Sequence, residues 1–154
     1  MTQRFDYDLL VIGAGSGGVR AARKSAEFGA RVAVVEEAAL GGTCVNVGCI
    51  PKKLYVYASE FASAWREAKG FGWRSDGVSF DWDTLRDNKS KEIARLNAIY
   101  ERLLNAPGVD IITGHGTLTG PQSVLVNGHT YHAEKILLAT GTWPALPDLS
   151  LIHI

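Results

Sequence analysis

A glycine-rich turn between an apolar run and a helical stretch constrains the fold of this chain more than any other feature. Residues 7–12 are apolar enough to predict a buried strand, residues 17–28 have helical periodicity, and residues 31–35 predict a second strand. The turn reads Gly13-Ala14-Gly15-Ser16-Gly17-Gly18, and Glu36 follows the second strand, eighteen residues after Gly18. This order is typical of a βαβ unit that binds a dinucleotide.

Each residue of this fingerprint has a physical role. Gly13 permits the tight turn, Gly15 lets the backbone approach a pyrophosphate, and Gly18 allows the helix to pack closely. The phosphates would lie at the helix N-terminus. The Glu36 carboxylate accepts hydrogen bonds from both hydroxyls of a ribose and repels a 2′-phosphate, so the sequence favours FAD or NAD over NADP at this site.

Composition narrows the class of protein. The 154 residues are 46% hydrophobic and 21% charged, which suits one globular domain with a sizeable core. Sixteen basic residues balance sixteen acidic ones, so no net field favours nucleic acid or an anionic membrane surface. No apolar run approaches a membrane span, and Asp6 and Asp8 stand where a signal peptide would be apolar. We therefore expect a cytoplasmic protein without nucleic-acid or membrane partners.

The rest of the chain predicts an α/β fold, a Rossmann-like domain with a parallel sheet, long helices and a small antiparallel meander. One helix is expected over 51–69 and another from about residue 84, capped by Asp83 and ending before Pro107-Gly108. A final buried strand over 135–139 ends in Thr140-Gly141, a glycine turn of the kind that holds ligands. The strands expected in the meander are residues 109–113, 116–119, 123–126 and 131–133.

Cys44 and Cys49 are the only cysteines in the chain. Lys52, Lys53 and a helix start at Pro51 offer the positive charge and helix dipole that lower a thiol pKa, so the pair indicates redox chemistry. Alternatives remain open: inert buried thiols, a structural disulfide, or a zinc site. A zinc site would combine the cysteines with some of three histidines, His115, His129 and His132.

The spacing of the cysteines adds a geometric constraint. Residues five apart in a regular helix have Cα atoms roughly 8 to 9 Å apart, beyond the ~7 Å that a disulfide bridges. The segment that bonds them must therefore be distorted, and Gly48 is placed to absorb the distortion.

Over residues 7–147 the chain closely resembles the N-terminal part of the flavin-dependent pyridine nucleotide-disulfide oxidoreductases. The glycine fingerprint, Glu36, the segment Gly41-Gly42-Thr43-Cys44-Val45-Asn46-Val47-Gly48-Cys49 and Leu138-Ala139-Thr140-Gly141 carry the resemblance. It implies that Cys49 faces the flavin as the charge-transfer thiolate and that Cys44 attacks the substrate disulfide. The residues expected at FAD are Gly13, Gly15, Ser16, Gly17, Gly18, Glu36, Thr43, Cys44, Lys52, Gly116, Thr140 and Gly141.

Within that family, the nearest match is to members that reduce glutathione disulfide with NADPH. Ser16, Arg23 and Tyr100 match their substrate-binding residues, and a guanidinium such as Arg23 suits a carboxylate. Lys52-Lys53 departs from the Ser-Lys usual in dihydrolipoamide dehydrogenases. A lipoamide, mercuric or trypanothione-type relative is the alternative, and so is a non-catalytic nucleotide-binding module.

The sequence lacks some of the family's machinery. It contains no second glycine fingerprint for NADPH, no dimerisation domain and no C-terminal His-Glu pair. We therefore expect residues 1–148 to be an incomplete FAD-binding domain, the amino-terminal piece of a homodimeric enzyme, without turnover alone. Residues 149–154 depart from the family pattern and look like an atypical tail.

Overall fold

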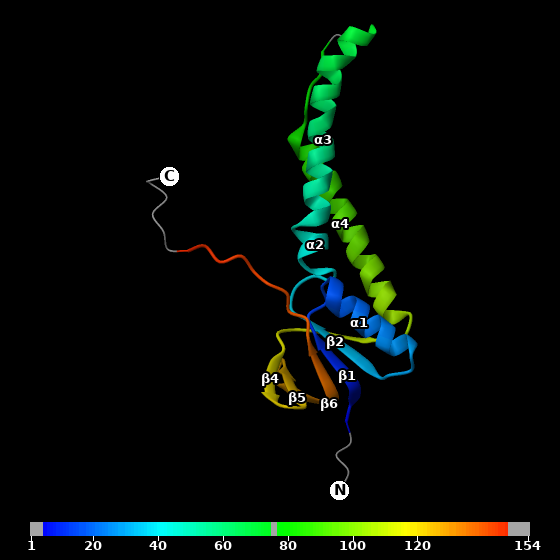
Figure 1. The fold of residues 1–154 in the computed structure, drawn as a ribbon, viewed down its shortest axis with the longest axis vertical. Coiled ribbons are helices and arrows are strands. Elements are labelled where there is room, and N and C mark those ends of the chain that lie inside the picture. The colour runs from blue at the N-terminus through cyan, green and yellow to red at the C-terminus, as the bar shows by residue number, and fades with distance from the viewer. Residues whose placement is uncertain (1–4, 75–76, 148–154) are drawn as a thin grey trace.

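One six-stranded sheet organises the molecule (Figure 1). The computed structural model describes residues 5–74 and 77–147. The strand order is β3-β2-β1-β6-β5-β4, with β1 parallel to β2 and β6, and β2 parallel to β3. The strands are β1 (Tyr7–Ile12), β2 (Val32–Glu36), β3 (Asp110–Thr113), β4 (Thr117–Gly120), β5 (Ser123–Val126) and β6 (His129–Leu138).

The predicted βαβ unit is confirmed. Helix α1 (Ser16–Glu27) joins β1 to β2, and Gly29, with φ of +92°, follows its end. One core cluster packs α1 and the end of α4 against β1 and β2, and includes Val11, Ala22 and Leu104. A second cluster on the other face packs the β5 residues Val124 and Val126 against β1 and β2. Because both faces of β1 and β2 are covered, residues 9–12 and 32–35 are apolar, as expected for parallel strands.

The predicted antiparallel meander is confirmed as β4, β5 and the first half of β6, but two of the strand predictions were wrong. Residues 110–113 form β3, which pairs parallel to β2 at the sheet edge and so belongs to the parallel sheet. The two strands expected over 131–133 and 135–139 are one strand, β6. Its first half pairs antiparallel with β5 and its second half parallel with β1, so the exposed Glu134 and Lys135 interrupt the apolar pattern without ending the strand.

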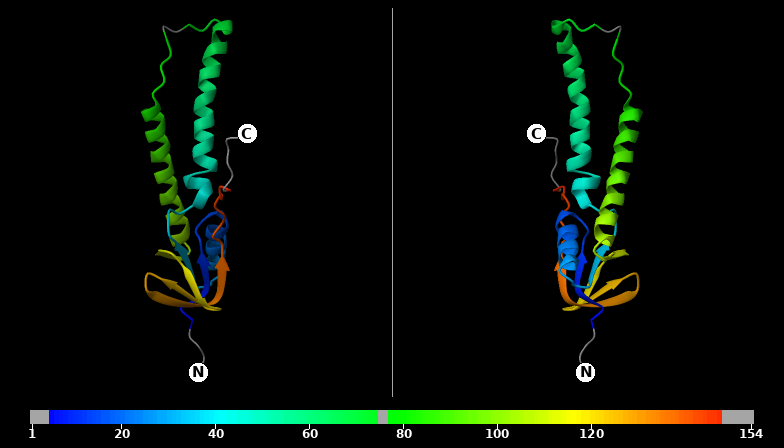
Figure 2. Two further views of the ribbon diagram at one scale, coloured as in Figure 1. Left: turned by 90° about the vertical axis from the view of Figure 1, so that its left-hand side faces the viewer. Right: turned by 90° about the vertical axis from the view of Figure 1, so that its right-hand side faces the viewer.

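The long helices project from the sheet as a hairpin (Figures 1 and 2). Helix α3 (Cys49–Ala68) continues into the short helix η1 (Lys69–Phe71), and α4 (Trp82–Asn105) returns to the sheet. Helix α3 begins at Cys49 and not at Pro51, and a short helix before it, α2 (Gly42–Asn46), was not predicted. The N-cap of α4 is Asp81, not Asp83, because the Asp81 carboxylate accepts hydrogen bonds from the backbone N–H of Asp83 and Thr84.

Within the described residues, none of the helices combines the length and apolarity needed to span a bilayer. Residues 149–154, expected to be an atypical tail, lie outside the described residues.

The ionisation of Tyr7 makes the stability of the fold depend on pH in the alkaline range. Burial, and then a hydrogen bond of 3.0 Å that its hydroxyl donates to Asp110 Oδ2, raise the pKa of Tyr7 from 10.0 to about 12. The folded state therefore holds this proton when the unfolded state has lost it, so the stabilisation is complete below pH 10 and is lost as pH rises toward 12.

We expect Tyr7→Phe to flatten the decrease in the free energy of unfolding between pH 10 and pH 12, as measured by urea denaturation. Asp110→Asn keeps the burial of the tyrosine and removes the carboxylate, so it should give an intermediate slope. A Tyr7→Phe slope equal to that of the parent protein would contradict this assignment.

Candidate functional site

The fingerprint turn is fixed by the carboxylate at the end of β2. Glu36 Oε2 accepts a hydrogen bond of 2.7 Å from the Ala14 N–H, and Oε1 accepts one of 2.9 Å from the Ala38 N–H. Each carboxylate oxygen has a second lone pair, so Glu36 retains acceptors for ribose hydroxyls. The turn also contacts the residue that follows β6, because a Cβ added to Gly13 would lie 2.4 Å from the Ala139 carbonyl oxygen.

The backbone of the glycine turn is in direct contact with the backbone of Gly41 and Gly42, which lead to Cys44. A Cβ on Gly42 would lie 2.7 Å from Gly15 Cα, and the Gly41 N–H donates to the Ala14 carbonyl at 2.8 Å. Gly42 therefore allows this approach, whereas a Cβ on Gly15 would meet Gly42 Cα at an ordinary 3.8 Å and leaves Gly15 for the predicted pyrophosphate. A Cβ on Gly18 would lie 1.8 Å from the Gly13 carbonyl oxygen, which confirms that Gly18 permits close packing of α1.

Three more residues predicted at the cofactor gather at the carboxyl ends of the parallel strands, while Thr43 and Cys44 lie on α2 and Lys52 on α3. Thr140 and Gly141 directly follow β6, and Thr140 Cα lies beside Gly13. Gly116 lies over the ends of β1 and β2, because its Cβ would meet Ile12 and Val35 at 3.3 and 3.2 Å. This is the edge at which open α/β sheets bind ligands.

These residues fit a dinucleotide such as FAD. Gly15 is the N-cap of α1 and has no side chain to cap the helix, so the first-turn N–H groups face the crevice as anion donors. Ser16 and Gly17 are exposed there, and a Cβ on Gly17 would meet no described atom within 4 Å. Gly15, Ser16 and Gly17 would hold the pyrophosphate, and Glu36 the ribose.

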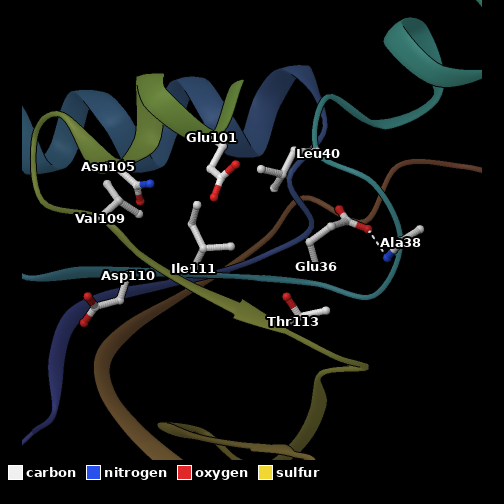
Figure 3. Close-up of a pocket in the computed structure, with 9 residues that line it drawn as sticks. All are labelled: Glu36, Ala38, Leu40, Glu101, Asn105, Val109, Asp110, Ile111 and Thr113. Atoms are coloured by element: carbon white, nitrogen blue, oxygen red, sulfur yellow. Dashed lines mark hydrogen bonds between the residues drawn. The ribbon is translucent and has the colours of Figure 1, made fainter. Parts of the chain in front are cut away.

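A polar cavity of about 400 Å³ adjoins Glu36 (Figure 3). It lies between the last turns of α4 and the strands β2 and β3, with Glu36 and Thr113 at one end and Asn105 and Val109 at the other. Its lining residues are Glu36, Ala38, Leu40, Glu101, Asn105, Val109, Asp110, Ile111 and Thr113. The cavity therefore lies beside Glu36. Neither Cys44 nor Cys49 is among the described residues that line it.

The redox segment is distorted where the spacing of the cysteines requires it. Cys44 lies within α2 and Cys49 is the first residue of α3. Between them, Gly48 has φ of −120° and ψ of −108°, outside the helical region. A Cβ on Gly48 would lie 2.9 Å from the Thr43 carbonyl oxygen, so glycine is required for this close approach. The prediction that Gly48 absorbs the distortion is confirmed.

Both cysteines are free thiols, Cys44 half-buried and Cys49 exposed. A hydrogen bond with the Cys49 thiol, followed by burial, raises the pKa of Cys44 above its ordinary value. The expected lowering was wrong for Cys44, because the nearby charge of Lys52 is the weakest of these effects and Lys53 lies over the Tyr57 ring, 5.3 Å from its centroid. The close sulfurs are nevertheless placed to exchange a proton or form a bond.

The predicted substrate residues lie on two helices of the same layer. Arg23 on α1 has a buried Nε that lies 3.4 Å from Glu27 Oε1 without hydrogen-bond geometry, and among the described residues it has no hydrogen-bond partner. Tyr100 on α4 is half-buried and packs against the first core cluster. Helices α1 and α4 are in contact. Because the Nε is buried beside Glu27, a carboxylate would have to approach the part of the Arg23 side chain that remains accessible, 29% of it.

The described residues do not bring together the ligands that the zinc alternative needs. His115 Nδ1 contacts Glu37 Oε2 at 2.6 Å, His129 packs edge-on against Tyr131, and His132 Nδ1 lies 3.9 Å from Asp6 Oδ2. None of these histidines accompanies a cysteine. Over residues 5–74 and 77–147, no cluster of three or more His, Cys, Asp or Glu side chains could hold a metal.

Sequence reasoning missed two asparagines beside the redox segment. Asn46 closes α2, and Asn97 on α4 donates a hydrogen bond of 2.9 Å to its Oδ1. Both lie in segments that carry predicted site residues. A single polar residue on a helix gives no periodic signal, so only the tertiary contact between α2 and α4 reveals the pair.

A dinucleotide-type crevice beside a pair of neighbouring thiols defines a class of redox protein that uses a nucleotide cofactor. Comparison with protein families makes the class specific: residues 7–151 match the pyridine nucleotide-disulphide oxidoreductase family, and the chain belongs to it.

Its relatives include several glutathione reductases. It is 49% identical over 148 residues to that of Burkholderia cepacia, covering 96% of this chain and 33% of the relative. It is 44% identical to the chloroplastic/mitochondrial protein of Pisum sativum, covering 96% and 29%. It is 43% identical to that of a Nostoc species, covering 94% and 32%. The chain spans about a third of the length of these relatives.

Proposed function

We propose that this chain forms part of the FAD-binding and disulfide-bearing portion of an NADPH-dependent glutathione-disulfide reductase. The observation that carries the proposal is the contact between the glycine fingerprint and the Cys44 loop, where Gly15 and Gly42 meet backbone to backbone. This contact places the two thiols beside the crevice that suits a dinucleotide. Relatives named glutathione reductase, 43% to 49% identical over nearly the whole chain, support the substrate.

The two cysteines can reduce one molecule of glutathione disulfide by two thiol–disulfide exchange steps. Starting from the reduced pair, the Cys44 thiolate attacks one sulfur of glutathione disulfide, forms a mixed disulfide and releases one glutathione thiolate. The Cys49 thiolate then attacks the Cys44 sulfur, closes the Cys44–Cys49 disulfide and releases the second glutathione. Bound FAD would supply the two electrons that return the pair to dithiol.

The Cys44 thiol holds its proton more tightly than an ordinary thiol, chiefly because of its hydrogen bond with Cys49, and this higher pKa opposes formation of the attacking thiolate. Two groups assist the exchange. The Lys52 charge favours the Cys44 thiolate, and Arg23 would bind a carboxylate of the substrate.

Full-length protein containing this chain would be a homodimer, as the family resemblance implies. Helix α3 and the segment after it expose large apolar side chains, including Phe61, Phe71 and Trp73. A patch of this kind is typical of a surface that is covered in the assembled protein.

We expect the purified full-length protein to contain FAD and to reduce glutathione disulfide with NADPH. On reduction it should develop a long-wavelength thiolate–flavin absorbance. Its kcat/KM for glutathione disulfide should exceed that for lipoamide or trypanothione disulfide by at least about tenfold, since a site built around charged substrate groups rejects analogues that lack them. Preference for another disulfide would assign the chain to a different member of the family. Binding of NAD without flavin would contradict the enzyme assignment.

A further inference from the structure

The loop that leads into the Cys44 helix has its carbonyl oxygens bound by one side chain. Asn46 Nδ2 lies within hydrogen-bond distance of three of them, Ala39 at 3.3 Å, Leu40 at 3.1 Å and Gly42 at 2.9 Å. Since the amide nitrogen faces these oxygens, the Asn46 amide oxygen must face the other way. Asn46 therefore ties the end of α2 to the segment that precedes it.

Helix α4 completes this network. Asn97 Nδ2 donates to the Leu40 carbonyl at 2.8 Å and to Asn46 Oδ1 at 2.9 Å. Both amide protons are thus used, and the Leu40 carbonyl accepts from both asparagines. The contacts are partly buried, where hydrogen bonds are less exposed to competition from water.

The same loop is attached to the glycine fingerprint on its other side, through the Gly41 N–H and the Ala14 carbonyl. Helix α2 is only five residues long and has a glycine N-cap with φ of +97°, so its own helical bonds fix it weakly. Its position therefore depends on its surroundings, where Val45 is buried and these two attachments hold the preceding loop. The first belongs to the nucleotide crevice, and the second comes from α4, three residues before Tyr100.

We infer that Asn97 is a positioning residue that acts through Asn46 to hold Cys44 close enough to Cys49 for the disulfide to form. The inference deepens the proposed function, because it rests on Cys44 and Cys49 being the redox pair. Asn97 contacts neither sulfur in the network described, so it affects the equilibrium between dithiol and disulfide and takes no part in the exchange itself.

The test is the equilibrium of the purified protein with oxidised and reduced dithiothreitol. The two protein thiols give two electrons and two protons to oxidised dithiothreitol, and the Cys44–Cys49 disulfide forms. Asn97→Asp places carboxylate oxygens against the Leu40 carbonyl and Asn46 Oδ1, so it should repel the loop. We expect the equilibrium constant for disulfide formation to fall about tenfold, or about 30 mV for a two-electron couple.

Asn97→Ala removes the donors without adding charge and suits a helix, so it should shift the equilibrium in the same direction by less. Asn88→Asp makes the same chemical change at an exposed position of α4 and should leave the equilibrium unchanged. Circular dichroism checks that each variant is folded, since a general loss of structure would move the melting temperature as well as the thiol equilibrium.

Equilibrium constants within twofold of the parent in both Asn97 variants would overturn the inference, and so would failure of both variants to fold. If the parent protein contains no flavin, the proposed function is wrong, but the thiol–disulfide equilibrium can still be measured. If the parent protein is an active flavoprotein and the Asn97 variants have the same equilibrium constant as Asn88→Asp, only the inference about Asn97 is wrong.

Discussion

Cys44→Ser and Cys49→Ser should each lower the rate of NADPH-dependent glutathione-disulfide reduction in the full-length protein by about 1,000-fold or more. Each substitution removes a sulfur that must form and break a covalent bond, and a hydroxyl at this position has neither the acidity nor the nucleophilicity to replace it. Reduction of bound flavin by NADPH does not need the sulfurs, so it should persist in a single turnover. The measurements are steady-state kinetics and stopped-flow absorbance.

The two variants should differ in their spectra, and the difference assigns the roles. With Cys44 replaced, Cys49 cannot enter a disulfide, so the thiolate–flavin absorbance should be present before any reductant is added. With Cys49 replaced, this absorbance should be missing. Exposure alone would suggest the opposite roles, since Cys49 is the more exposed of the two thiols. A charge-transfer absorbance in Cys49→Ser and none in Cys44→Ser would reverse the assignment.

The cysteine spacing predicted the geometry of the segment but not its electrostatics. Two cysteines five residues apart in a regular helix are too far from each other to form a disulfide. The geometry of the helix alone therefore predicted the break at Gly48. The pKa of Cys44 depends instead on which neighbour its thiol contacts. Cys49 is that neighbour, and Lys53 turns toward Tyr57, neither of which a linear sequence specifies.

The βαβ unit could be predicted because its determinants are local. Residues 9–12 and 32–35 are apolar, the glycines lie at fixed positions, and Glu36 is the last residue of β2. Strand β3 was misplaced because residues 110–113 pair with β2, whose sequence lies more than seventy residues earlier. Short strands carry too little pattern to reveal which edge they join. The asparagine network was missed for the same reason, since it joins segments about fifty residues apart.

Gly18→Ala should destabilise the fold by about 3 to 5 kcal/mol, a large part of the 5 to 15 kcal/mol typical of a domain. The added Cβ would lie 1.8 Å from the Gly13 carbonyl oxygen, with Val11 Cγ1 at 3.3 Å. These are a backbone atom and a fully buried side chain, so neither can rotate away. Helix α1 would have to move off β1, which would open the first core cluster. Urea denaturation of the parent and variant proteins measures the change.

Gly17→Ala is the matched control, because it adds the same methyl group one residue earlier in the same helix. Here the Cβ meets no described atom within 4 Å, so stability should stay the same or rise by about 0.4 to 1 kcal/mol through the lower entropy of the unfolded chain. The same methyl would be exposed beside Gly15 and Ser16, which are expected to hold the pyrophosphate, so it should weaken flavin binding about tenfold, measured by fluorescence titration. Gly18→Ala would then reduce flavin content by unfolding, and Gly17→Ala by steric exclusion from a folded site. Equal stability of the two variants would contradict the packing assigned to Gly18, and unchanged flavin affinity in Gly17→Ala would place the cofactor elsewhere.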